Sequence, residues 1–256
     1  MFKRLRILVL LLILLFVALN TYFDRVYSTD WDTPLRVTVF PINGDGSPVT
    51  ERYIGTLDGE TFVSVDAFFE EQAPHFGVAL RQPVRFALGR QIRELPPILE
   101  PNSGLLTSII WSLRTRYWAW RAPEHVGPKP DVELFVLYHD PEKSKTLPHS
   151  IGLQKGLFGI VNAFADREME GSNDTVMAHE FLHTLGATDK YNLVDNQPLH
   201  PIGYAEPARE PLYPQRYAEI MGGRIPLSEG ESRIPASLHQ VVVGPATALE
   251  IGWTKR

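Results

Sequence analysis

The sequence predicts an α+β fold built on a partly parallel sheet. A strand is expected at Arg36–Phe40, a helix at Val65–Gln72 and a second strand at Val84–Leu88. A crossover of this kind normally joins two parallel strands of one sheet. Apolar residues make up 44% of the 256 residues, which is enough to form a substantial core. Residues 30–256 are therefore expected to form one large domain or two closely packed lobes.

Composition excludes several classes of function. The formal net charge is −5 and no long basic run is present, so a nucleic-acid partner is not expected. The chain contains no cysteine. Disulfides, thiolate metal sites and cysteine nucleophiles are therefore excluded.

Residues 1–29 have the character of a membrane anchor or a signal segment. Lys3, Arg4 and Arg6 precede an unbroken apolar run at Ile7–Leu19. The run is shorter than the ~18 residues of a confident membrane span, but no small-residue cleavage site follows it closely. Because positive flanks stay in the cytoplasm, we predict a membrane anchor with the rest of the chain exported to the periplasmic or extracellular side. The alternative is secretion after signal cleavage.

The first predicted elements have simple local signals. The first strand alternates around Val37 and Val39, and the turn cluster Asn43–Pro48 follows it. The helix expected next begins near Ser64 or Asp66, either of which can serve as its N-cap.

A longer helix is predicted at Leu105–Trp120. It carries tryptophans and a tyrosine among three arginines, a combination that could rest on a membrane surface. The preferred interpretation is an amphipathic helix packed on the core, with membrane contact as the alternative. The apolar positions at helical spacing are Leu106, Ile109, Ile110 and Leu113.

Four further elements complete the expected order. Leu134–Tyr138 is almost continuously apolar, as is typical of a central strand. Gly156–Ala165 is a weaker strand candidate because it contains two glycines. Ser237–Val243 and Ala246–Trp253 predict a strand or loop followed by a closing helix.

The segment Asp174–Gly186 is predicted to be a helix with clear ends. Ser172, Asn173 or Asp174 can cap its start. Gly186 can end it in a left-handed conformation, which glycine adopts without a steric penalty.

This helix carries a pattern of residues suited to metal chemistry. His179 and His183 are four residues apart and therefore share one face, so that both imidazoles can bind one ion at ~2.0–2.1 Å. Glu180 lies beside that face, where a general base for a metal-activated water is expected. The pattern predicts a catalytic zinc site, and two incidental histidines are the simpler alternative.

A catalytic zinc ion usually has a third protein ligand. Asp189 is the preferred candidate, because Gly186 can reverse the chain and bring a residue three positions later to the metal. His200 and Glu206 are the reserve candidates.

The run His179–Asp189 resembles the extended HExxHxxGxx(H/D) signature of the metzincin metallopeptidases. Aspartate at the last position is similar to the smaller snapalysin-like group. Met221 matches in order and local character the methionine turn that this clan has beneath its metal, although a core methionine is the alternative. Directly, the resemblance covers only residues 174–223.

The resemblance implies a twisted mixed sheet with the active-site helix in an upper lobe and an irregular lower lobe. It also implies an edge strand that pairs with extended substrate, a place that Gly156–Ala165 occupies in the sequence. A tyrosine assists the transition state in some members of the clan. Tyr191, Tyr204 and Tyr217 are all candidates for that role here.

These observations predict a Zn²⁺-dependent peptidase that acts on peptide or protein substrates, with Glu180 as general base. One alternative is a non-enzymatic envelope protein with a structural or decayed metal site. Another is a zinc amidase acting on a non-peptide substrate such as cell-wall material.

Overall fold

The computed structural model describes Arg6, Leu11 and residues 29–99, 103–125, 127–154 and 156–254. The segment predicted to be an anchor or signal lies almost entirely outside these ranges, so that prediction stays a prediction. Among the helices that are described, none is both long enough and apolar enough to cross a membrane.

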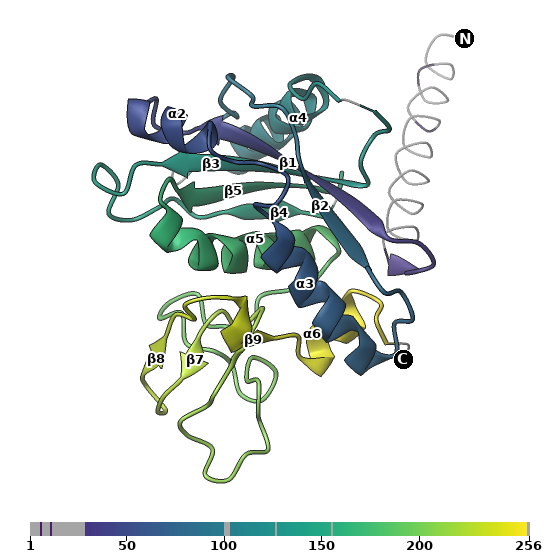
Figure 1. The fold of residues 1–256 in the computed structure, drawn as a ribbon, viewed down its shortest axis with the longest axis vertical. Helices are drawn as coiled ribbons and strands as arrows, with labels where there is room; N and C mark the ends of the chain where they lie inside the picture. The colour runs from purple at the N-terminus through teal and green to yellow at the C-terminus, as the bar shows by residue number, and fades with distance from the viewer. Residues whose placement is uncertain are drawn as a thin grey trace.

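A five-stranded mixed sheet forms the centre of an α+β fold (Figure 1). Its order is β2 (Val84–Leu88), β1 (Leu35–Asn43), β3 (Val132–His139), β5 (Phe158–Phe164) and β4 (Ile151–Leu153). The first four strands are parallel, and β4 runs antiparallel to β5.

The predicted strands are present, and the parallel crossover from β1 to β2 is confirmed by the pairing of Val37 with Phe86. The central position predicted for Leu134–Tyr138 is also confirmed. The prediction that Gly156–Ala165 forms the edge strand is wrong, because β4 covers the outer side of β5. A strand of three residues has no alternation long enough to be recognised in the sequence.

One face of the sheet is covered by α3 (Val63–Gln72) and α5 (Glu170–Thr184), which bury Phe69 and Phe181 against each other. The predicted caps of α3 were wrong, since Phe62 occupies the N-cap position. Ser64 donates a hydrogen bond to Asp174 on α5, and Asp66 accepts one from the backbone of β2. Both side chains thus serve tertiary contacts instead of capping.

A helix that the sequence did not predict follows β1. It is α2 (Pro48–Ile54), and Ser47 caps it by accepting a hydrogen bond from the backbone N–H of Thr50. The cap and the proline at its first position are ordinary start signals. They were missed because the Asn43–Pro48 cluster was interpreted only as a turn.

The opposite face of the sheet is covered by α4 (Leu105–Arg121). Trp118 and Ala119 pack there on a second core cluster that includes Phe135. The expectation that this helix packs on the core is therefore confirmed. The four apolar positions noted in the sequence do not make the contact, because all of them are exposed: Leu106, Ile109, Ile110 and Leu113.

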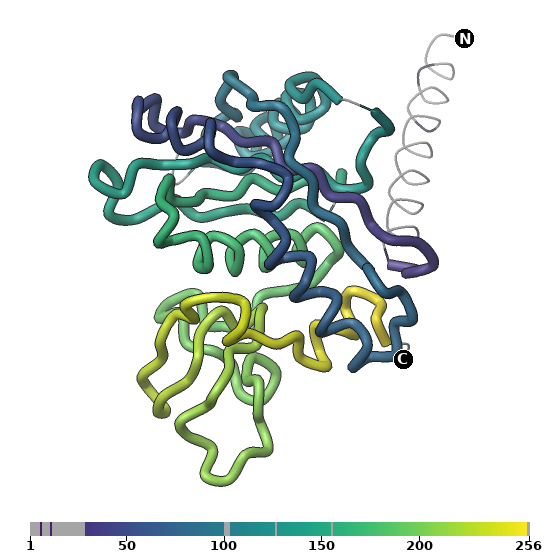
Figure 2. The backbone as a smooth tube through the Cα atoms, viewed as in Figure 1, coloured from purple at the N-terminus to yellow at the C-terminus, as the bar shows by residue number. Residues whose placement is uncertain are grey.

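After α5 the chain forms a largely irregular lobe, whose path Figure 2 shows. It contains two small sheets. β6 (Ala218–Glu219) pairs with β9 (Val241–Val242), and β7 (Ile225–Pro226) pairs with β8 (Ser232–Arg233). The final helix, α6 (Pro245–Glu250), returns the chain to α3. There Trp253 packs against Trp31 and Phe69.

Candidate metal centre

The helix that carries the predicted motif begins one turn earlier than expected. α5 starts at Glu170, after a short 3-10 helix whose own start is capped by Asp166. The proposed cap Asn173 instead exchanges two hydrogen bonds of 2.9 Å with the backbone of Phe164. The side-chain amide therefore fixes α5 to β5 and sets the depth of the helix against the sheet.

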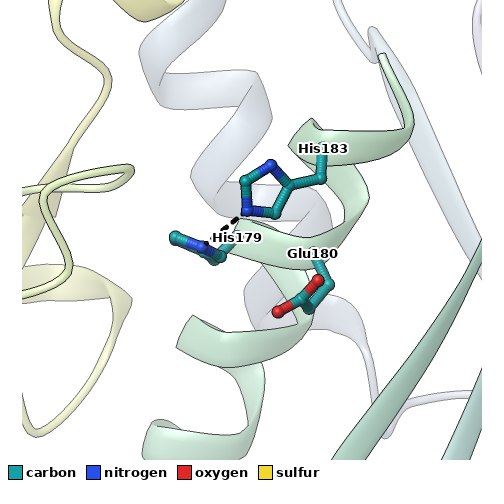
Figure 3. A group of neighbouring side chains, drawn as sticks. All are labelled: His179, Glu180 and His183. Atoms are coloured by element: carbon teal, nitrogen blue, oxygen red, sulfur yellow. Dashed lines mark hydrogen bonds between the residues drawn. The ribbon is translucent and has the colours of Figure 1, made fainter. Parts of the chain in front are cut away.

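The two histidines of α5 converge as their spacing predicts. Figure 3 shows both imidazoles meeting, with 3.0 Å between their Nε2 atoms. Each Nδ1 lies within hydrogen-bond distance of a backbone carbonyl: His179 at 2.9 Å from Ile220, and His183 at 2.8 Å from Ala187. Because a carbonyl only accepts, each Nδ1 carries the proton, and Nε2 is left with a free lone pair.

Asp189 joins the two imidazoles from the loop after α5. Its Oδ1 lies 3.2 Å from Nε2 of His179 and 3.1 Å from Nε2 of His183. Gly186 makes this possible, since its φ of +102° reverses the chain and lets Ala187 bond back to the carbonyl of Leu182. The predicted chain reversal at this glycine is confirmed.

These three atoms fit a metal ion. Ligands of a tetrahedral zinc ion stand ~3.3 Å apart when each bond is ~2.0–2.1 Å. The three separations in the protein are close to that value. Two lone pairs and a carboxylate oxygen repel each other at this range unless a cation lies between them. The cluster His179, Glu180 and His183 can hold a metal ion, and Asp189 adds an anionic oxygen to it.

The charges of the centre also favour a cation. Burial opposes a charge on His183, but Asp189, the carboxylate of Glu180 and the carbonyl of Ala187 together outweigh this and raise the pKa of the imidazole. Burial likewise opposes the charge on Asp189, yet the two histidines hold the pKa of that carboxyl well below its usual range. The same attraction that draws a proton into the cluster would draw a metal ion.

Glu180 lies beside the histidines on the same helix (Figure 3). Glu180 is 7% exposed, and its side-chain atom Oε2 has no hydrogen-bond partner among the described residues. Burial raises the pKa of this carboxyl, and His179 and His183 only partly oppose the effect. A buried oxygen without a partner is costly, which suits a group reserved for a ligand or a reacting water.

The floor of the site is formed by a turn around Met221. This methionine is fully buried, and its carbonyl accepts a hydrogen bond of 2.8 Å from the backbone of Lys190. The preceding Ile220 supplies the carbonyl that orients His179. Beneath the turn, the buried carboxylate of Glu219 accepts hydrogen bonds from the backbone of Gly222 and from α6 and its N-cap.

A cavity of about 330 Å³ opens beside the cluster. His179, Glu180 and Tyr191 line it, together with apolar side chains such as Val176 and Ile234. Burial and the charge of Asp189 raise the pKa of Tyr191 to about 12, so its hydroxyl keeps its proton at neutral pH.

Of the three candidate tyrosines, Tyr191 is the one that lines the cavity beside the histidines. The Tyr204 hydroxyl pairs with that of Tyr213, and Tyr217 lines a different cavity.

The reserve ligands have other partners. Glu206 forms an ion pair with Arg216, and Nε2 of His200 lies 3.3 Å from the carbonyl of Pro207. Three residues that support the cluster were not predicted: Gly152 on β4, Lys190 beside Asp189, and Glu250 on α6. Gly152 contacts residues about 30 positions away and Lys190 pairs with Glu250 60 positions away, so no local spacing could have identified these contacts.

Comparisons with known proteins add no assignment. The chain matches no family model, and a search of curated proteins gives no significant match.

Proposed function

We propose that the protein is a zinc-dependent peptidase of metzincin-like type. His179, His183 and Asp189 would be the metal ligands, and Glu180 the general base. The observation that carries the proposal is the triangle of Nε2, Nε2 and Oδ1 atoms, with sides of 3.0–3.2 Å, beside a buried carboxylate oxygen without a partner.

Each ligand residue is held for this task by its own contacts. The carbonyls of Ile220 and Ala187 keep the histidine protons on Nδ1 and aim Nε2 at the ion. Aspartate as the third ligand resembles the snapalysin-like group. When bound, a zinc ion would supply a Lewis acid and lower the pKa of a coordinated water towards ~7.

The chain's own residues would manage the proton. Glu180 would accept it from the attacking water and deliver it to the leaving amine. Burial raises the pKa of this carboxyl, which makes it a stronger proton acceptor. Tyr191 retains its hydroxyl proton and stands at the edge of the same cavity, where it would donate a hydrogen bond to the developing oxyanion.

A peptide substrate agrees with the surroundings of the site. The short edge strand β4 contacts α5, and its outer side offers backbone groups to an extended chain. The adjoining cavity has room for a side chain and is lined partly by apolar residues.

The deciding experiment compares the zinc-loaded wild type with Glu180→Gln on a peptide library. The amide keeps the size of the side chain but cannot accept the proton, so the rate should fall by ~10²–10⁴ while zinc content stays the same. Equal rates would show that Glu180 is not the base. If the zinc-loaded wild type cleaves no peptide, the peptidase proposal fails, and a screen of non-peptide amides then tests the amidase alternative.

A further inference from the structure

We infer that the outward face of α4 is a membrane-docking surface that rests on anionic lipid. Six large apolar or aromatic side chains lie on this face and are exposed; Leu106 and Trp120, for example, are 71% and 72% exposed. The full set, called the α4 stripe below, is Leu106, Ile109, Ile110, Leu113, Tyr117 and Trp120.

The stripe is continuous and opposite to the packed face of the helix. At 100° per residue its six positions fall within an arc of ~100°. The buried residues Thr115, Trp118 and Ala119 lie on the other side and contact the sheet. The helix is thus apolar on both sides, whereas a helix that only covers a sheet is polar on its outer side.

The chemistry around the stripe favours lipid. α4 contains Arg114, Arg116 and Arg121 but no acidic residue, although the chain as a whole carries a net charge of −5. Arg121 forms an ion pair with Glu94, so the cationic character of the helix comes from Arg114 and Arg116. Tyr117 and Trp120 have the amphipathic rings that gather at the membrane–water interface. A second copy of the chain would bring two cationic helices together, whereas anionic headgroups complement them.

The anchor predicted from the sequence would hold the whole domain close to a bilayer. The apolar run Ile7–Leu19, predicted to insert in a membrane, is joined to Trp31 by residues 20–30. This stretch spans at most about 40 Å. A domain held that close to a bilayer meets lipid at a high local concentration.

Docking through α4 would also orient the candidate metal centre. α4 and α5 cover opposite faces of the sheet (Figure 1). With α4 on the lipid, the metal centre would face away from the membrane and receive substrates from the aqueous side.

The test uses the full-length chain, which has no cysteine of its own. A single Ile109→Cys probe carries an environment-sensitive fluorophore, and Val194→Cys in the lower lobe, which is 91% exposed, is the matched control. Each labelled protein is floated with vesicles of phosphatidylcholine and phosphatidylglycerol. We expect a blue shift, and quenching by spin-labelled lipid, at position 109 and not at 194. Adding Leu106→Glu and Leu113→Glu should abolish both signals at position 109.

Three results would overturn the inference. One is the same emission wavelength at positions 109 and 194 in the floated fraction. Another is failure of the chain to float with the vesicles. The third is a blue shift at position 109 without vesicles that grows with protein concentration, which would identify a second copy of the chain as the occupant. None of these readouts depends on zinc or on peptide hydrolysis.

Discussion

The ammonium group of Lys190 lies 2.7 Å from a carboxylate oxygen of Glu250, although the two residues are 60 positions apart. The backbone N–H and the hydroxyl of Thr188 donate to the same carboxylate. Both neighbours of Asp189 are therefore bound to α6. Burial opposes the charge of Glu250, but these contacts outweigh it and lower the pKa of the carboxyl.

Glu250→Gln should weaken metal binding without touching a ligand. The Lys190 side chain is 1% exposed, and in the variant its charge would be left with neutral acceptors only, the Thr188 carbonyl and the new amide oxygen. Loss of the ionic partner should cost about 1–3 kcal/mol of unfolding free energy. Loss of orientation at Asp189 should lower metal affinity ~10–100-fold. Urea unfolding and titration against a chelator measure the two effects.

Lys190→Met is the matched control for the contact between Lys190 and Glu250. It leaves the charge on Glu250, whose side chain is 31% exposed and can be hydrated, so its cost should be smaller. The double variant Lys190→Met/Glu250→Gln should regain part of the stability lost in Glu250→Gln. If Glu250→Gln binds the metal as tightly as the wild type, the contact between Lys190 and Glu250 does not position Asp189.

Asp189→Ala should reduce zinc occupancy sharply, and His183→Ala should do the same. Each substitution removes one of three atoms that lie within 3.2 Å of one another. His200→Ala and Glu206→Ala should bind zinc like the wild type, because their side chains have other partners. Elemental analysis of the four variants gives the answer, and the opposite pattern would move the third ligand to the lower lobe.

Gly152→Ala on β4 should displace the histidines of the candidate centre. A Cβ at this position would stand 2.3 Å from the Cβ of His183 and 2.6 Å from the carbonyl oxygen of Glu180. The strand and α5 would have to separate, at a cost of about 1–3 kcal/mol.

Gly230→Ala is the matched control, since nothing lies within 4 Å of its added Cβ. We expect thermal stability and peptide hydrolysis to fall together in Gly152→Ala and to stay unchanged in Gly230→Ala. Full activity in Gly152→Ala would mean that β4 can shift without disturbing the histidines.

The elements predicted best from the sequence are those with long local signals. β2 was predicted with its observed ends, and the helical spacing of His179 and His183 brought their Nε2 atoms together as expected. β4 could not be predicted because three residues carry no period, and its pairing depends on Gly152 facing Gly159 across the sheet. The caps of α5 failed for a related reason, since Asn173 binds β5 instead of its own helix.

The candidate site likewise has a part that the sequence predicted and a part that it did not. Its reactive groups come from one short segment and could be found by spacing alone. Apart from the Ala187 carbonyl, which orients His183 within the same segment, the supporting groups named above come from distant parts of the chain, as the carbonyl of Ile220 and the carboxylate of Glu250 illustrate. Such contacts are products of the tertiary fold, and a single sequence contains no pattern that reports them.

Asp66 should make the folded protein more stable in mild acid than at neutral pH. Burial raises the pKa of this carboxyl to about 6, and the hydrogen bond from the Phe86 backbone N–H only partly opposes the effect. The ordinary value of ~3.9 applies in the unfolded chain. Protonation therefore favours the folded state: the gain is complete below pH ~4 and is lost as the pH rises through about 6.

Asp66→Asn removes this titration but keeps an oxygen that can accept from the Phe86 N–H. It should raise the unfolding free energy at pH ~8 by about 1–2 kcal/mol, after allowance for partial solvent screening. The gain should shrink as the pH falls towards ~5, because the wild-type carboxyl then becomes neutral as well. Urea unfolding at several pH values measures the difference, with the exposed Asp195→Asn as the matched control. A gain independent of pH would show that the substitution acts through packing and not through the charge of Asp66.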